Sequence, residues 1–194
     1  MYGRLLASLN RKRFQEFLVK LDEEIASPVR ALGCPDPECG GPLHAAPFQR
    51  KPRGLVVDPE LCKRLSFCCA VDGCRGRVTP PSVRFLGRRV YSAAIVVVVT
   101  AMRCGAKPAR MKTLRDLLGV CRQTVLRWQY WWRQMLPQTP LWRARSGLLR
   151  EQVALQELPQ SLLARFSGSV ARRVLHLLFF LGPLTGGLRS GVAM

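Results

Sequence analysis

Two short cysteine motifs are the part of this chain whose residue types and spacing could do chemistry. Cys34 and Cys39 are separated by four residues, as are Cys69 and Cys74, and 29 residues lie between the two pairs. A glycine stands two places after the second cysteine of each pair. Four thiolates from two turns form the closed tetrahedral set that a structural zinc ion takes. We therefore predict that these four cysteines bind Zn²⁺, in a site with no open position for catalysis.

Three further residues are alternative ligands. Cys68 precedes Cys69 and could exchange with it, while His44 and Cys62 lie between the pairs and could each replace one cysteine. Only Cys69 preserves the matched spacing, and a histidine in a strand more often makes a single hydrogen bond than it binds a metal. The paired spacing also favours zinc over disulfides.

Positive charge dominates the chain and is concentrated in one part of it. The 194 residues include 31 Lys and Arg against 12 Asp and Glu, a net charge of +19. Residues 75–150 hold sixteen of these basic residues and a single acid, Asp116. Such a chain binds polyanions, and the concentration of charge indicates a binding surface.

Neither export nor membrane insertion is expected. The first twenty residues carry charges among their apolar positions and lack an apolar signal segment. The longest apolar run, Tyr91 to Met102, has 12 residues, and a bilayer span needs about 20. We expect a soluble, cytoplasmic protein that associates with the nucleoid and has no membrane partner.

Residues 113–128 have the pattern of two helices joined by a tight turn. Gly119 would let the turn take a positive φ, Val120 would fill the core beneath it, and Cys121, a poor N-cap, would precede the second helix. Apolar residues recur at helical spacing and should face inward: Leu114, Leu117, Leu118, Val125, Trp128, Trp132 and Met135.

The other face of the second helix carries side chains suited to a DNA major groove. We predict that six of them contact duplex DNA: Arg122, Gln123, Leu126, Arg127, Tyr130 and Arg133. Seven further arginines are predicted to bind phosphates beside them: Arg50, Arg53, Arg75, Arg77, Arg84, Arg88 and Arg89. The zinc is expected to hold this basic platform rigid next to the second helix.

The order of these segments carries a family resemblance over residues 34 to about 135. It rests on the cysteine pairs, the basic strand 48–54, the run 79–89 and the sequence Leu-Leu-Gly-Val-Cys-Arg-Gln-Thr-Val-Leu-Arg-Trp that ends at Trp128. Together they resemble the zinc-ribbon plus helix-turn-helix modules of bacterial insertion-sequence transposases and of small proteins linked to such elements. The resemblance implies sequence-specific recognition of element DNA.

The chain lacks the nuclease of a transposase. A DDE enzyme needs three carboxylates to hold two metal ions, and the only acids after Asp72 are Asp116, Glu151 and Glu157. Tyr130 is better explained in the recognition helix than as a nucleophile. We therefore expect a non-catalytic accessory or regulatory protein of a mobile element.

The expected fold class is α+β, mainly α, with a small β zinc ribbon followed by a helix-turn-helix domain. Tyr91 to Cys104 could be a strand by propensity, but its length favours a buried helix. Residues 11–26 should form an amphipathic helix that stops before Pro28. The expected divisions are an N-terminal helix in 1–30, the ribbon in 31–82, the helix-turn-helix in 83–137, a helical extension in 138–181 and a disordered tail in 182–194.

Two other functions fit the sequence. Single-stranded RNA could stack on Phe48, Phe67 or Trp128 if those rings are exposed. Alternatively, the apolar helix Val174 to Leu181 could dock a transposase or a second copy of the chain, although burial in the core accounts for it more simply.

Overall fold

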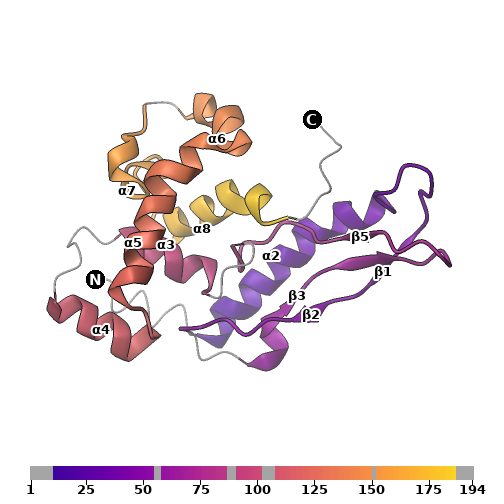
Figure 1. Ribbon diagram of the computed structural model, residues 1–194, viewed down its shortest axis with the longest axis horizontal. Helices are drawn as coiled ribbons and strands as arrows, with labels where there is room; N and C mark the ends of the chain where they lie inside the picture. Colours follow the sequence, from indigo (N-terminus) through magenta and orange to yellow (C-terminus); the bar gives the residue numbers. More distant parts are fainter. Residues whose placement is uncertain (1–10, 55–57, 87–90, 102–107, 150–151, 187–194) are drawn as a thin grey trace.

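The computed structural model describes residues 11–54, 58–86, 91–101, 108–149 and 152–186. This part of the chain is mainly helical, with two small antiparallel sheets (Figure 1). The predicted α+β class with a predominance of helix is confirmed. Within the described ranges, none of the helices has the length and apolar character needed to cross a membrane.

Helix α2 (Lys12–Ala31) is the amphipathic helix expected near the N-terminus. Leu18 and Ala26 are buried on its inner face. The prediction that it stops before Pro28 is wrong, because the helix continues for three residues beyond Pro28, to Ala31. A proline costs a helix one backbone hydrogen bond, and here the loss falls in the last turn, where the N–H of Leu32 still bonds to the carbonyl of Pro28.

The strands form two antiparallel sheets. In the three-stranded sheet the order is β1 (Leu43–Ala45), β4 (Phe67–Cys69) and β5 (Arg77–Val78). In the two-stranded sheet, β2 (Phe48–Gln49) pairs with β3 (Lys63–Arg64). The 3-10 helix η1 (Pro59–Cys62) leads directly into β3.

One face of the three-stranded sheet is buried and the other is open. Alternation along the strands places Leu43, Phe67, Cys69 and Val78 on the buried face. With Ala26 they belong to a small hydrophobic cluster that is separate from the main core.

Helix α3 (Ala93–Ala101) forms the centre of the main core. All nine of its residues are buried, and it packs against α5 and α8. The helix predicted over Tyr91 to Cys104 is confirmed for these nine residues, while Cys104 lies outside the described ranges. A helix that is apolar on every side must be surrounded by other elements, so α3 fixes where the other helices pack.

Helices α4 (Pro108–Leu118) and α5 (Arg122–Tyr130) are joined by a three-residue turn. The second helix continues without a break into the π-helical η2 (Trp131–Met135) and the 3-10 turn η3 (Leu136–Gln138). The long helical segment therefore presents one continuous surface from Arg122 onward.

The described C-terminal part of the chain is helical, and its helix α8 packs against α3. Its elements are α6 (Pro140–Arg145), η4 (Ser146–Leu148), η5 (Leu155–Glu157), α7 (Gln160–Leu163), α8 (Val170–Leu181) and η6 (Gly182–Thr185). In α8, Val174, Leu177, Leu178 and Leu181 are buried. The ring of Phe180 meets Trp142 of α6 edge-to-face, with centroids 6.4 Å apart.

Of the two explanations offered for the apolar C-terminal helix, the structure therefore supports burial in the core. The disorder expected from Gly182 onward is wrong as far as Gly186, since Gly182 and Thr185 are buried in η6. The remainder of that predicted tail lies outside the described residues.

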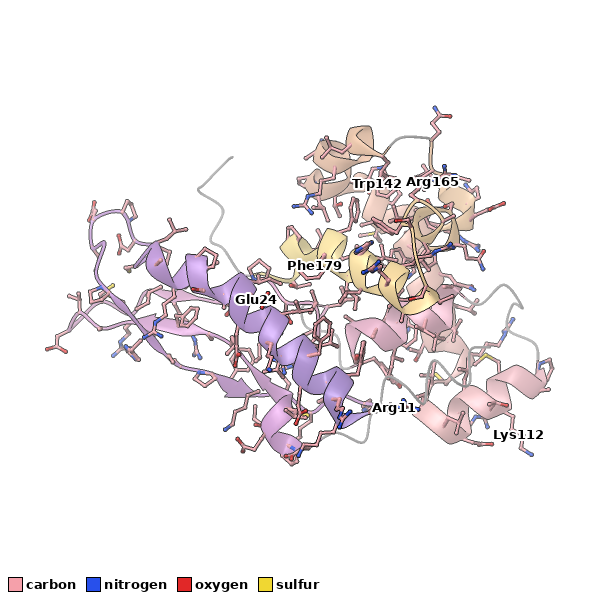
Figure 2. The ribbon with its side chains drawn as sticks, turned by 180° about the vertical axis from the view of Figure 1, so that it is seen from behind. Arg11, Glu24, Lys112, Trp142, Arg165 and Phe179 are labelled. Carbon is pink, nitrogen blue, oxygen red and sulfur yellow. The ribbon has the colours of Figure 1, made fainter. Side chains whose placement is uncertain are left out.

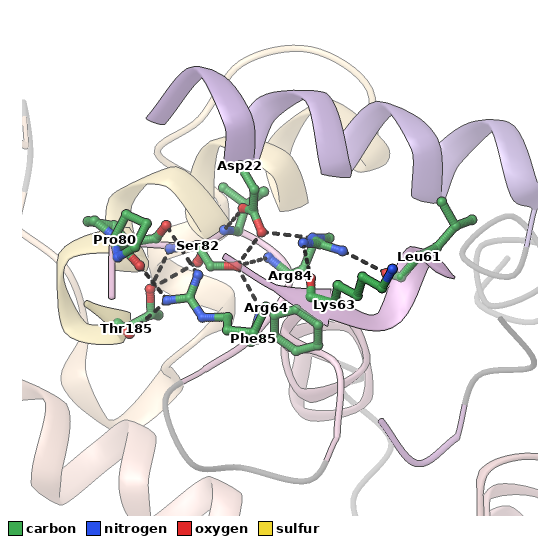
Figure 3. A network of polar contacts seen from close by, with 11 residues as sticks. Asp22, Leu61, Lys63, Arg64, Pro80, Ser82, Arg84, Phe85 and Thr185 are labelled. Carbon is green, nitrogen blue, oxygen red and sulfur yellow. Dashed lines mark hydrogen bonds and ion pairs between the residues drawn. The ribbon is translucent and has the colours of Figure 1, made fainter. Parts of the chain in front are cut away.

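A buried polar network connects α2 to the segment before α3 (Figure 3). The Asp22 carboxylate is fully buried. It accepts hydrogen bonds from the Ser82 hydroxyl at 2.6 Å and the Val83 N–H at 2.8 Å, and pairs with Nε of Arg84 at 2.7 Å. The other two guanidinium nitrogens of Arg84 donate to the carbonyls of Leu61 and Lys63.

A second buried arginine extends this network to the C-terminal elements. Arg64 donates to the carbonyls of Pro80 and Thr185, and burial lowers its pKa to about 10. The Thr185 hydroxyl accepts from the Ser82 N–H and donates to the Ser82 carbonyl. Four segments far apart in sequence are thereby held together: α2, η1–β3, residues 80–84 and η6.

Candidate metal centre and nucleic-acid interface

The two cysteine motifs fold into turns of the same form. In the first turn, the N–H of Cys34 bonds to the carbonyl of Gly41 at 2.8 Å and that of Cys39 to Asp36 at 3.1 Å. The second turn repeats both bonds, from Cys69 to Gly76 at 2.8 Å and from Cys74 to Val71 at 3.1 Å. The repeated sequence therefore makes a repeated structure.

These turns bring the four thiols together as a possible metal site. The Sγ atoms of Cys34 and Cys74 are 3.6 Å apart, as are those of Cys39 and Cys69. All four lie within 4.8 Å of one another. A tetrahedron with metal–sulfur bonds of about 2.3 Å has edges of about 3.8 Å, so the observed spacing fits a single tetrahedral ion.

The neighbouring thiols also shift one another's pKa values, and a bound cation could take the place of their protons. The pKa of Cys74 is lowered, first by the backbone N–H of Gly76 and then by the Cys39 and Cys34 side chains. The largest single effect on Cys34, the hydrogen bond from the backbone N–H of Asp36, lowers its pKa, but burial and the neighbouring thiols together outweigh it and raise the pKa to about 12. A divalent ion would stabilise all four as thiolates.

The alternative ligands lie elsewhere. Cys68 is opposite His44 in the β1–β4 pairing, on the face of the sheet away from Cys69. Cys62 ends η1, outside the cysteine cluster. Among the described residues, the one candidate metal-binding group consists of the four cysteines of the two turns.

Gly76 is required next to this cluster because its backbone passes close to the sulfurs. A Cβ atom there would lie 2.6 Å from Sγ of Cys34 and 3.4 Å from Sγ of Cys74. We predict that Gly76→Ala weakens metal binding about tenfold, measured by competition with a chelator of known affinity. Gly147→Ala is the matched control, since a Cβ there meets no atom within 4 Å. Equal metal affinity in both variants would contradict the prediction.

The turn between α4 and α5 has the features that the sequence predicts. Gly119 has φ +62°, Val120 is completely buried, and the Tyr91 hydroxyl donates to the Gly119 carbonyl at 2.9 Å. The Tyr91 ring meets that of Trp128 edge-to-face, with centroids 5.1 Å apart. Tyr91 therefore contacts both the turn and α5.

Most of the predicted inward-facing residues are buried. Those buried as predicted are Leu114, Leu118, Val125, Trp128 and Trp132. Two predictions are wrong, because Leu117 is 62% exposed and Met135 is 46% exposed. Leu117 lies off the buried stripe of α4 marked by Met111, Leu114 and Leu118, and Met135 lies in the π-helical turn, which does not follow α-helical periodicity.

All six side chains predicted to read DNA are exposed. They are Arg122, Gln123, Leu126, Arg127, Tyr130 and Arg133. In the described residues none of the three ion pairs involves α4 or α5. The poor cap is also confirmed, because Cys121 makes no side-chain capping bond to the start of α5. Its sulfur instead lies 3.2 Å from the Thr124 hydroxyl, which contributes most to lowering the pKa of Cys121.

The arginines predicted to bind phosphate have different surroundings. Arg53, Arg75 and Arg77 are exposed and Arg50 is half-buried. The prediction for Arg84 is wrong, because it is 4% exposed and its guanidinium is saturated by Asp22 and two carbonyls. Arg88 and Arg89 lie outside the described residues.

The two cysteine turns and α5 lie at opposite ends of the molecule (Figure 1). The expectation that the metal holds a platform beside the second helix is therefore wrong in its placement. The β-region instead contacts the helices through residues 50–54, the segment that follows β2. Arg53 forms a β-bridge with Tyr91, and a Cβ at Gly54 would lie 3.2 Å from the carbonyl of Leu118.

Sequence reasoning missed the buried network of Asp22, Arg64, Arg84 and Thr185. One signal was present, since Asp22 falls four residues after Leu18 and four before Ala26, on the inner face of α2. A carboxylate on an apolar face implies a buried cationic partner.

No protein-family model, curated protein or solved structure matches this chain.

Proposed function

We propose that the protein is a zinc-stabilised DNA-binding protein that recognises duplex DNA through α5. The observation that carries this proposal is the exposed face of α5 and η2. Three arginines, a glutamine, a leucine and a tyrosine lie along it, and the described part of α5 contains no acidic residue.

The arrangement of α4 and α5 supports a helix-turn-helix. Gly119 at φ +62° makes the turn tight, and the buried Val120 and Trp128 fix the second helix against the core. In such a unit the N-terminal residues of the second helix contact base edges in the major groove. Arg122 and Gln123 occupy those positions, and Arg127 lies about one turn further along the same exposed face.

The chemistry of these side chains suits base recognition. Arginine donates two hydrogen bonds to guanine, glutamine pairs with adenine, and an apolar side chain contacts the thymine methyl group. Leu126 is 37% exposed between Arg122 and Tyr130 on this face. Arg53, beside the α4–α5 turn, would bind phosphate without reading sequence.

The metal in this proposal is zinc, and its role is structural. Cysteine thiolates in a tetrahedral set of four are the ligands of structural zinc sites, which leave no position for a substrate. The zinc-bound region forms a small ribbon, whose buried cluster contains two of the four ligands, Cys34 and Cys69. The protein acts here without catalysis, as an accessory or regulatory protein of a mobile element.

The test is a selection from random duplex DNA followed by affinity measurements on the enriched sequence. We predict that Arg122→Ala and Arg127→Ala each weaken binding to that duplex by about 1–3 kcal/mol and leave binding to a scrambled duplex less affected. Arg53→Ala should weaken binding to both duplexes alike and reduce the log–log salt slope by about 0.9. Fluorescence anisotropy at several salt concentrations measures both effects.

Arg172→Ala is the matched control, since Arg172 is exposed on α8 and is not part of the face of α5 and η2. It should bind both duplexes as the unmodified protein does. If Arg122→Ala and Arg127→Ala also bind normally, α5 is not the recognition helix. Failure to enrich any sequence would remove the claim of specificity.

A further inference from the structure

The open face of the three-stranded sheet carries a row of polar side chains. His44, Cys68 and Arg77 occupy matched positions on β1, β4 and β5, opposite to the buried face. His44 and Arg77 are exposed, and Cys68 is half-buried. Phe48, at the start of β2, lies beside this row and is 37% exposed.

Arg77 is held in a fixed position on this face. Its Nε donates to the Ser66 hydroxyl at 2.9 Å and its Nη2 donates to the Ala46 carbonyl at 2.9 Å. The centre of the guanidinium lies 5.8 Å from the centroid of the Phe48 ring, within the range of a cation–π contact. The side chain is therefore ordered before any ligand arrives.

Among the described residues, the charge of Arg77 has no carboxylate partner, because none of their ion pairs includes it. The strands β1, β2, β4 and β5 contain no acidic residue. Glu60, in the helix before β3, is paired with Lys63 at 2.6 Å. Lys51 and Arg53 are exposed further along the chain from Phe48.

We propose that Phe48 and Arg77 form a binding site for an unpaired nucleotide of a single-stranded nucleic acid. An exposed ring with a fixed guanidinium offers a surface on which a base stacks, and the guanidinium and the lysine and arginine that follow attract the phosphates. The bases of a duplex are already stacked on one another and are not available to this site. The site is separate from α5 and does not depend on the duplex function proposed above.

Base-dependent binding is the property to measure. The full-length protein is titrated into a labelled thymidine oligomer and into an abasic oligomer of the same length, which has the same phosphates but no bases. We expect the thymidine oligomer to bind about tenfold more tightly. Phe48→Leu should reduce this ratio to about one and leave the abasic affinity unchanged. Arg77→Lys keeps the charge but loses the planar group, so it should also reduce the ratio.

Two variants should keep the ratio. Phe48→Trp retains an aromatic ring, and Phe17→Leu removes an exposed ring on α2 that is 44% exposed. Arg122→Ala and Arg127→Ala should also keep the ratio of thymidine to abasic affinity. The duplex proposal can therefore fail without affecting this measurement. A uridine oligomer distinguishes single-stranded RNA from single-stranded DNA as the ligand. Base-dependent binding of the uridine oligomer, without such binding of the thymidine oligomer, would point to RNA.

Two results would overturn the proposal. One is equal binding of the thymidine and abasic oligomers by the unmodified protein. The other is an undiminished ratio in both Phe48→Leu and Arg77→Lys, with thermal melting showing that both variants are folded.

Discussion

Replacing Cys69 with serine should release the metal and unfold the cysteine end of the protein. Cys69 is 5% exposed and belongs both to the thiol cluster and to the small hydrophobic cluster beneath the sheet. Binding of structural zinc contributes about 10 kcal/mol or more to the folding of small zinc-binding units. A cluster this small has little apolar area with which to replace that contribution.

The measurement is metal content by atomic emission together with the loss of β-structure by circular dichroism. Cys68→Ser is the matched control, because it changes the adjacent residue on the other face of the same strand. We expect about one zinc per chain in the unmodified protein and in Cys68→Ser, and almost none in Cys69→Ser. Absence of metal from the unmodified protein, or its retention in Cys69→Ser, would refute the zinc assignment.

Replacing Asp22 with alanine should destabilise the protein by about 3–5 kcal/mol, because it leaves the buried Arg84 without its carboxylate. The same change removes the acceptor for the Val83 N–H and the Ser82 hydroxyl. Single domains have about 5–15 kcal/mol of stability in total. The expected loss is therefore a large part of the whole.

Chemical denaturation measures this loss, with Glu24→Ala as the control. Glu24 is exposed on the same helix (Figure 2), and its replacement should change the free energy of unfolding by less than about 0.5 kcal/mol. The double variant Asp22→Leu with Arg84→Met should recover part of the stability, because no buried charge remains unpaired. Equal stabilities of Asp22→Ala and Glu24→Ala would show that the network contributes little.

The parts of this structure that could be predicted are those set by local sequence. The four-residue spacing of each cysteine pair dictates a turn, and the same turn forms twice. Gly119 followed by Val120 indicates a tight turn above a buried residue, and the structure has that turn. The apolar run that contains α3 is too long and uniform for a small half-exposed strand, and its helix follows from that.

The end of α2 beyond Pro28 is a local error, but the most consequential incorrect predictions concern contacts between distant segments. Arg84 has the same local sequence character as the exposed arginines, yet Asp22 lies opposite it from a helix some sixty residues earlier. Leu117 fits a helical repeat by spacing, but the buried stripe of α4 is narrower than the sequence suggests. Met135 also fits the repeat, but it lies in the π-helical turn, which does not follow that periodicity. The spacing of residues along a helix does not determine which of its faces other elements of the fold will cover.

The sequence by itself determined the set of four cysteines and the two turns that carry them. It also determined the α4–α5 turn and the exposed basic face of α5. Each of these features depends on residues that are close together in the chain. Only the tertiary structure decided that the cysteine turns lie at the far end of the molecule from α5 (Figure 1). It also decided that Arg84 is buried and that Arg77 stands over Phe48 on an open sheet face. The physical reason is that burial and charge pairing depend on which surfaces meet, and long-range packing around α3 and Asp22 fixes those surfaces.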